Sequence, residues 1–274
     1  MSLPEIVTRE QWLAARRELL AREKEMTRQR DALNADRRRL PMVRMDSDYQ
    51  FEGPNGRVRL IDMFGDRRQL VLQHVMFDPA WDDACPACTA GLDEVNGAQL
   101  QHLAARETTF VAVSRAPLAK IENYRVRQGW TFPWYSSNGS DFNYDFGASV
   151  DPAVAPAHYN YRDADELVAA GLDWIVAEPR EMTGVSCFLR DGDAVFHTYS
   201  AFGRGMEQMG GAYVILDMTA LGRQEDWEEP KGRSSVAHDA IPDFAPADVP
   251  GPAIPAVGAT GALLAMASGP SCCS

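Results

Sequence analysis

Residues 82–89 read DDACPACT, and this stretch places two cysteines three positions apart directly after a run of strand-forming residues. On its N-terminal side, residues 69–77 (QLVLQHVMF) are a mostly apolar run of strand length. On its C-terminal side, residues 86–105 carry apolar side chains at helical spacing. Cys85 and Cys88 are therefore predicted to lie where a buried strand ends and a helix begins.

Outward from this junction, strand and helix patterns alternate along the middle of the chain. Residues 57–61 are predicted to form a short strand, residues 108–114 a buried strand, and residues 117–128 a helix that opens with proline. Two further strands, 184–190 and 193–200, flank the tight turn Asp191-Gly192. Residues 206–221 are predicted to form a closing helix, weakened by Gly210 and Gly211. This order predicts an α/β fold, a mixed β-sheet flanked by helices.

The N-terminal 45 residues are predicted to form a helical arm. Residues 8–40 contain no internal glycine or proline, and Thr8 with Gln11 forms a capping-box pattern. Apolar side chains recur there at every seventh position, although the complementary heptad positions are not apolar throughout: Trp12, Leu19, Met26, Leu33 and Leu40, against Ala15, Arg22 and Gln29. Two readings stay open, a helix packed along its own domain and an arm exchanged across a homodimer.

The remainder divides into a central domain and a tail. Residues 46–233 carry the predicted sheet, with an insert at about 148–183 that includes a predicted helix at 163–170. In residues 234–274, 25 of 41 positions are Ala, Pro, Gly or Ser, a composition that buries too little apolar surface to offset the entropy of ordering. A disordered tail is expected.

Charge and hydropathy exclude several classes of function. The net charge is −12, and the only basic excess lies in residues 1–45, with 11 Lys and Arg against 7 Asp and Glu, so nucleic acid is not an expected partner. No apolar run reaches the roughly 18 to 20 residues that cross a bilayer, and the N-terminus has no apolar core of a signal peptide. We expect no membrane association and a cytoplasmic location.

Five cysteines in 274 residues are too few for a disulfide scaffold. The close pair is therefore expected to be catalytic, redox-sensing or metal-bound. A thiol in the first turn of a helix lies at the positive end of the helix dipole, which favours the thiolate. Cys85 is then the attacking thiol and Cys88, one turn later, the resolving thiol. Asp82 and Asp83 oppose this effect with negative charge.

Two other readings of the pair remain open. Tetrahedral zinc needs four N or S ligands, and the chain offers for the remaining ones only dispersed candidates: Cys272, Cys273, His74, His102, His158 and His197. The pair could also be purely structural. A protein with such a pair would then serve in binding or as a scaffold, without redox catalysis.

The wider sequence resembles a known family. A strand, C-P-x-C at a helix start, a βαβ order and a final hairpin resemble the thioredoxin fold, and Cys-Pro-Ala-Cys is similar to the C-P-x-C of glutaredoxins. Five stretches resemble an uncharacterised bacterial thioredoxin-like family, domain of unknown function 899: residues 60–77, 85–88, 110–118, 129–147 and 190–205. The likeness spans roughly residues 5–230 and implies a thioredoxin-like mixed sheet.

The resemblance implies thiol–disulfide exchange, with a thiol or disulfide substrate, an external dithiol or glutathione reductant, and neither organic cofactor nor metal. Two departures qualify it. Thioredoxin-like enzymes usually have a cis-proline before the hairpin strand, whereas residues 183–187 read TGVSC. Peroxiredoxins place a P-x-x-x-[T/S]-x-x-C motif at their reactive cysteine, whereas residues 78–85 read DPAWDDAC.

Several further residues are candidates for contacts at the dithiol. Substrate contacts are expected from Trp81, Pro86, Trp134, Ser186 and Cys187. For the aromatic segment 130–146 the alternatives are core packing and the wall of a groove, and Cys187 is either a buried strand cysteine or a third redox partner. His74 is either a packed strand histidine or a proton acceptor for Cys88.

Overall fold

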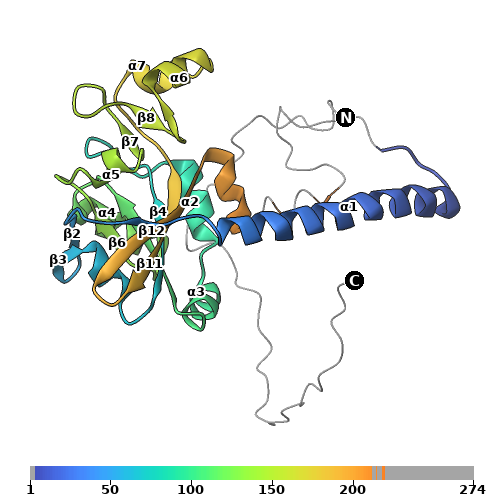
Figure 1. The fold of residues 1–274 in the computed structure, drawn as a ribbon, viewed down its shortest axis with the longest axis horizontal. Coiled ribbons are helices and arrows are strands. Elements are labelled where there is room, and N and C mark those ends of the chain that lie inside the picture. Colours follow the sequence, from blue (N-terminus) through green and yellow to red (C-terminus); the bar gives the residue numbers. More distant parts are fainter. Residues whose placement is uncertain (1–3, 212–213, 215–217, 220–274) are drawn as a thin grey trace, which may run out of the picture. The chain divides into compact units, whose positions relative to one another are not determined.

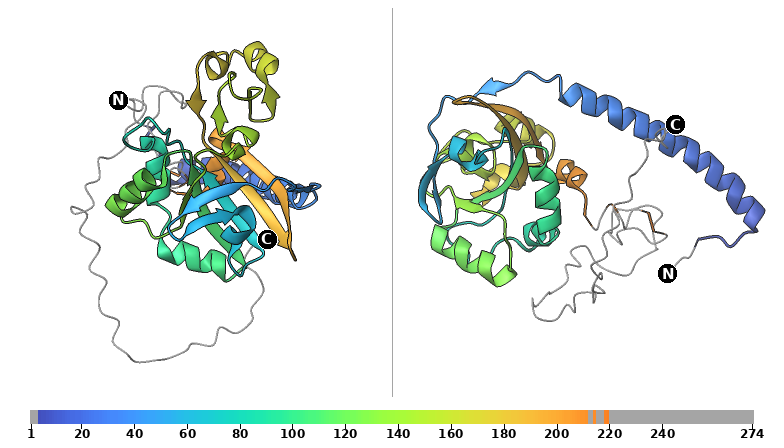
Figure 2. Two further views of the ribbon diagram at one scale, coloured as in Figure 1. Left: turned by 90° about the vertical axis from the view of Figure 1, so that its left-hand side faces the viewer. Right: turned by 90° about the horizontal axis from the view of Figure 1, so that it is seen from below.

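The computed structural model describes residues 4–211, 214 and 218–219 of the chain (Figure 1). Its main sheet has eight strands in the order β1-β12-β11-β4-β5-β6-β2-β3. In that order the strands are Val43–Arg44, Ala194–Phe202, Gly184–Asp191, Gln69–His74, Thr108–Ser114, Trp134–Ser136, Gln50–Gly53 and Gly56–Arg59. Figure 2 shows that the sheet is curled rather than flat.

The strand directions establish the fold. β4 runs parallel to β5, and β5 runs parallel to β6. On the other side of β4, β11 is antiparallel to it and forms a hairpin with β12 around Asp191 and Gly192. A parallel pair beside an antiparallel hairpin, with a helix starting after the first strand of the pair, is the arrangement of the thioredoxin fold. The predicted fold class is therefore confirmed.

Three helices pack against one face of the sheet. They are α2 (Pro86–Asp93), α3 (Gly97–Ala104) and α4 (Leu118–Gln128). Their core contains Cys88 and Leu92 together with the rings of Phe77, Trp130 and Trp134. The single helix expected over 86–105 is two helices, because Asn96 caps a new one by accepting a hydrogen bond from the Gln99 backbone N–H at 3.1 Å.

The opposite face of the sheet has a second core. A 3₁₀ helix, η1 (Leu60–Phe64), and the short helix α5 (Phe142–Asp145) cover it. The core includes Phe51, Phe64, Phe142 and Phe188, each at most 2% exposed. Complete burial of such a side chain contributes about 1.5–3 kcal/mol. Each face of the sheet is thus closed by its own apolar cluster.

Residues 148–183, the insert, have a third and separate core. Their elements are β7 (Ser149–Val150), β8 (His158–Tyr159), β9 (Arg162–Asp163), α6 (Ala164–Ala169), α7 (Trp174–Ala177) and β10 (Arg180–Glu181) (Figure 1). Leu167 and Ile175 are buried in this core. β7 and β10 pair antiparallel, so the first and last strands of the insert lie side by side. The helix predicted at 163–170 is α6.

The N-terminal helix α1 (Arg9–Arg37) has the predicted capping box, with Thr8 and Gln11 bonded to each other. None of its residues is buried. Near its C-terminal end, the Arg37 guanidinium lies 5.4 Å from the ring centroid of Tyr199. The helix is confirmed, whereas its exchange across a homodimer stays a prediction.

The predicted closing helix over 206–221 is wrong at its start. Residues Gly203–Met209 form a 3₁₀ helix, η2. It ends at Gly210, whose φ of 95° lies outside the helical region. The tail expected over 234–274, with Cys272 and Cys273, lies outside the described residues. Among the helices that are described, none combines the length and apolar character that a membrane crossing requires.

Candidate functional site: a dithiol at the start of a helix

Cys85 occupies the first position of the candidate site. It is the N-cap residue of α2, with Pro86 at the first helical position, where a missing N–H costs no hydrogen bond. The Cys85 backbone N–H donates to the carbonyl of Met76 at 2.9 Å, which fixes the cysteine beside the end of β4. Cys85 is half-buried and Pro86 is exposed. The thiol of Cys85 thus lies at the positive end of a helix dipole and within reach of solvent.

Cys88 lies one helical turn further on and is 6% exposed. A hydrogen bond between its side chain and that of Cys85, together with burial, raises the pKa of Cys88 well above its usual value. Hydrogen bonds from the Met76 backbone and the Thr183 side chain act in the opposite direction. At neutral pH, Cys88 is therefore the protonated partner that donates to the sulfur of Cys85.

Thr183 occupies the position directly before β11, where the resemblance implies a cis-proline. Its hydroxyl donates to the carbonyl of His74 at 3.2 Å and contacts the sulfur of Met206 at 3.5 Å. The same side chain bonds to Cys88. A side-chain hydroxyl thus faces the dithiol at the place where a proline ring was expected.

The insert brings Tyr159 to the site. Its ring packs edge to face on Phe202, with centroids 5.3 Å apart. Burial raises the pKa of Tyr159, a bond to the Gly203 backbone lowers it, and the charge on Cys88 raises it further. The Tyr159 side chain therefore lies beside Phe202 and Gly203, on the side of the molecule where Cys88 influences its pKa.

Residues 78–84 form the loop that leads into Cys85. Trp81 in this loop is 38% exposed, and its carbonyl accepts a hydrogen bond from Lys120 Nζ at 2.7 Å. Asp83 forms an ion pair with Arg127 of α4. This pairing offsets part of the negative charge that the sequence places next to Cys85. Trp81 and Pro86 remain as exposed candidates for substrate contacts.

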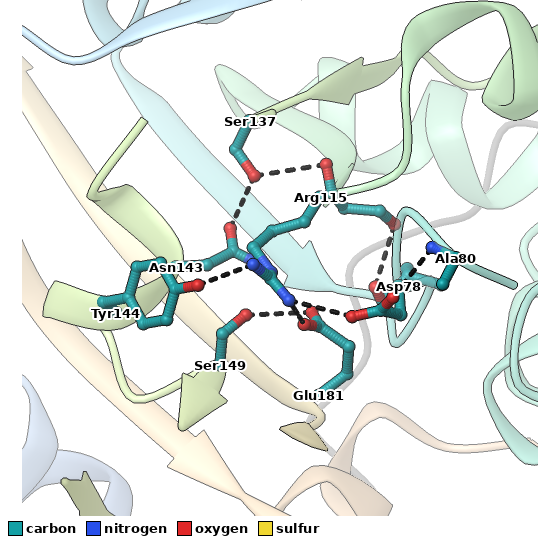
Figure 3. A network of polar contacts seen from close by, with 10 residues as sticks. Asp78, Ala80, Arg115, Ser137, Asn143, Tyr144, Ser149 and Glu181 are labelled. Carbon is teal, nitrogen blue, oxygen red and sulfur yellow. Dashed lines mark hydrogen bonds and ion pairs between the residues drawn. The ribbon is translucent and has the colours of Figure 1, made fainter. Parts of the chain in front are cut away.

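A network around Arg115, shown in Figure 3, connects this loop to the insert. Arg115 follows β5, and its Nη2 donates to Asp78 Oδ2 at 2.9 Å. Its Nε donates to Glu181 Oε1 at 2.7 Å, and its Nη1 donates to the hydroxyl of Tyr144 at 2.6 Å. Ser149 donates to the second oxygen of Glu181 at 2.9 Å. The network thus joins β5, α5, both end strands of the insert and the loop before Cys85.

The structure corrects the expectation for Trp134. Its side chain is 0% exposed and packs among the rings of Phe77, Tyr124 and Trp130. Its indole N–H donates to Ser114 Oγ at 2.9 Å. Trp134 is therefore a core residue with its polar atom satisfied, and it cannot contact a substrate without rearrangement of the core.

The substrate contact expected from Ser186 is also corrected, because its side chain lies on the face of the sheet opposite the dithiol. Its hydroxyl bonds to His74 Nε2 and to Ser200 Oγ, both at 2.8 Å, and Ser200 Oγ bonds to His197 Nε2 at 2.8 Å. We call these four residues the histidine chain. His74 stacks on Phe142, and burial lowers its pKa to about 3. Of the two readings of His74, the geometry agrees with the packed strand histidine.

Cys187 lies away from the dithiol. It pairs with Val71 of β4 and Tyr199 of β12, four residues beyond Thr183. That separation is about 13 Å along a strand. Burial raises the pKa of Cys187 to about 11, which leaves it protonated at neutral pH. Cys187 is therefore a half-buried strand cysteine, and its position does not agree with a third redox partner.

The sequence also left open the hypothesis that Cys85 and Cys88 bind a zinc ion. Over residues 4–211, 214 and 218–219, no group of three or more His, Cys, Asp or Glu side chains is arranged to hold a metal ion. Cys272 and Cys273, two of the candidate zinc ligands, lie outside this range.

Three residues that belong to the site were not predicted from the sequence: Thr183, Tyr159 and Arg115. Thr183 was noted only as a position without proline, and that departure was the available signal. Tyr159 and Arg115 are 74 and 30 positions from Cys85 in the sequence. No local pattern connects them to the cysteines, so only the folded chain reveals their place.

Comparison with protein-family models identifies the family of this chain. The family model described as bacterial protein of unknown function, DUF899, matches residues 1–240. Among curated proteins there is no significant match.

Solved structures similar to the chain include several peroxiredoxins. Xanthomonas campestris peroxiredoxin Q is 13% identical with a TM-score of 0.39, over 62% of this chain and 90% of that one. A cysteine mutant of peroxiredoxin 6 from Arenicola marina is 15% identical with a TM-score of 0.36, over 57% and 62%. A yeast mitochondrial 1-Cys peroxiredoxin is 20% identical with a TM-score of 0.30, over 64% and 75%. At such scores these likenesses carry no argument about the reaction.

Proposed function

Because the chain belongs to the DUF899 family, whose members are described as bacterial proteins of unknown function, we propose its reaction from the dithiol itself. The protein is a thiol–disulfide oxidoreductase in which Cys85 attacks and Cys88 resolves. The observation that carries this proposal is the position of Cys85 as N-cap of α2 with a buried, hydrogen-bonded Cys88 one turn later. Trp81 and Pro86 supply exposed surface for the substrate beside it.

In the first step the Cys85 thiolate attacks a disulfide of the substrate. A bond forms between Cys85 Sγ and one substrate sulfur, the substrate S–S bond breaks, and the other substrate sulfur leaves as a thiolate. The helix dipole of α2 and the hydrogen bond from Cys88 stabilise the attacking thiolate. The elevated pKa of Cys88 keeps its proton in place until Cys85 has reacted.

In the second step Cys88 transfers its proton to the substrate thiolate released in the first step, and the Cys88 thiolate attacks Cys85 Sγ. The bond between Cys85 and the substrate breaks, the second substrate thiolate leaves, and a Cys85–Cys88 disulfide remains. Two electrons have passed from the dithiol to the substrate. An external dithiol or glutathione then reduces the protein disulfide. Bonds from Thr183 and the Met76 backbone favour the Cys88 thiolate, so they assist this step.

An equilibrium redox titration in glutathione buffers tests the proposal. The full-length protein is equilibrated at a series of potentials, its remaining thiols are alkylated, and mass mapping identifies the cysteines that pair. The expected result is a reversible Cys85–Cys88 disulfide, with disulfide reductase activity at least about a hundredfold lower in Cys85→Ser.

Cys187→Ser is the matched control, because it removes a half-buried thiol that is remote from the pair. It should leave the titration unchanged. Equal activity in wild type and Cys85→Ser would rule out the mechanism. Absence of the Cys85–Cys88 disulfide at every potential would favour a binding protein without redox catalysis.

A further inference from the structure

We propose that Arg115 is a positioning residue for the dithiol, holding the insert and the loop before Cys85 in the arrangement that thiol exchange requires. This inference rests on the proposed function, since it assigns Arg115 a role at the same site. The partners of Arg115 in Figure 3 are Asp78, Tyr144 and Glu181. Its influence passes through Asp78 on one side and Glu181 on the other.

The positions of these two carboxylates connect Arg115 to both thiols. Asp78 is two residues from Met76, whose carbonyl accepts the Cys85 backbone N–H. Glu181 is two residues from Thr183, whose side chain bonds to Cys88. One guanidinium group therefore sets the relative position of the segment that holds Cys85 and the segment that contacts Cys88.

The ion pair between Arg115 and Glu181 is largely shielded from solvent, so neither charge can be lost without a cost in stability. Glu181 is 2% exposed, and the side chain of Arg115 is 20% exposed. Burial raises the pKa of Glu181, while the charge of Arg115 and the hydrogen bonds from Arg115 and Ser149 lower it. A carboxylate in this position needs its cation, because loss of one partner of a buried pair leaves an uncompensated charge.

The shape of the arginine side chain also matters. Nε, Nη1 and Nη2 donate in different directions, to Glu181, Tyr144 and Asp78. Lysine carries the same charge but cannot reproduce this planar fork. The insert has its own core and joins the domain through strands β7 and β10, so the Arg115 fork is suited to fix its orientation.

Arg115→Met alone leaves the buried Glu181 carboxylate without its cation and can prevent folding. The double variant Arg115→Met with Glu181→Gln removes both charges and keeps the side-chain volumes similar. Arg115→Lys keeps the charge without the fork. Arg125→Met is the matched control, because Arg125 is 24% exposed and pairs with Glu122 on α4, outside the network.

Two measurements are made on the full-length variants after circular dichroism has shown that they are folded. The first is the pH profile of Cys85 alkylation by iodoacetamide, read by mass mapping. The second is the potential of the Cys85–Cys88 pair in glutathione buffers. We expect the double variant and Arg115→Lys to change the alkylation rate at neutral pH by roughly tenfold or more and to shift the potential, whereas Arg125→Met matches wild type.

A folded double variant with the wild-type alkylation profile and potential would overturn the positioning role. A shift of equal size in Arg125→Met would overturn it as well, because any lost ion pair would then act alike. Failure of the proposed function is distinguishable. Without a Cys85–Cys88 disulfide in wild type the oxidoreductase proposal fails, but the alkylation profile still tests Arg115, since it requires no disulfide exchange.

Discussion

Titratable groups lie near the end of β4 on both faces of the sheet, and the two sets differ in their access to solvent. On the face of α2, Cys85 is half-buried at the start of a helix and Cys88 lies behind it. On the other face, His74 and Ser186 are 0% exposed and bond to each other within the histidine chain. Residue type alone therefore does not identify the chemistry. Solvent access and the position at a helix N-terminus distinguish the dithiol from the histidine chain.

Among substitutions on the two faces, Cys88→Ser is expected to have the largest effect on turnover. Without the resolving thiol, the mixed disulfide on Cys85 cannot be released within the protein, and turnover should fall by about a hundredfold or more. Mass spectrometry of the stalled protein should show the substrate attached to Cys85. Full turnover in Cys88→Ser would indicate that an external thiol resolves the intermediate and that the buried cysteine has no role in the reaction.

On the opposite face, Ser186→Ala should reduce stability and spare activity. The substitution leaves His74 Nε2 and Ser200 without their common partner, which costs about 1–3 kcal/mol in the free energy of unfolding. Urea unfolding measures this change, and the alkylation profile of Cys85 should stay that of wild type. A changed profile at unchanged stability would contradict the separation of the two faces.

The histidine chain should also make stability depend on pH. The folded pKa of His74 is about 3, below the ordinary 6.5, so its contribution is complete above pH 6.5 and is lost as the pH falls toward 3. The loss for one proton is at most about 1.4 kcal/mol per pH unit. In His74→Gln, the free energy of unfolding measured by urea at pH 7, 6, 5 and 4 should fall less steeply than in wild type. Parallel curves would show that His74 is not the titrating group.

The smallest expected effect is that of Thr183→Val. The variant keeps the shape of the side chain and removes the hydroxyl that bonds to Cys88, so the pKa of Cys88 should rise further and resolution should slow by about two- to tenfold. Stopped-flow measurement of the second step reads this rate. Thr198→Val, which removes a hydroxyl bonded to the Cys187 carbonyl instead, is the control. Equal slowing in both variants would remove Thr183 from the site.

Local patterns in the sequence were sufficient to predict the central strands and the position of the cysteine pair at the start of a helix. The apolar run 108–114 is the strand Thr108–Ser114, and Asp191-Gly192 forms the predicted turn. The helix predicted over 86–105 was wrong at Asn96, where local capping outweighs continuous helical spacing. The closing helix predicted over 206–221 was wrong at its start, because residues Gly203–Met209 form a 3₁₀ helix that ends at Gly210.

The surroundings of the dithiol could not be predicted in the same way. The rings in 130–146 looked alike in the sequence, but the strand pairing of β6 buries Trp134. Ser186 and Cys187 are adjacent, yet alternation along β11 sends their side chains to opposite faces and neither reaches the thiols. The contacts of Thr183, Tyr159 and Arg115 depend on segments far apart in the chain, and a single sequence contains no signal for their distances.

The two ends of the insert meet, because the Met182 backbone N–H donates to the carbonyl of Ala148 at 2.8 Å. A segment whose ends adjoin can be lengthened, shortened or exchanged while the strands on either side keep their positions. An exchange of residues 151–179 therefore leaves the paired end strands β7 and β10 in place, and with them the contacts of Ser149 and Glu181 in the Arg115 network. The same exchange replaces Tyr159, so it alters the surroundings of the dithiol without altering the Arg115 fork.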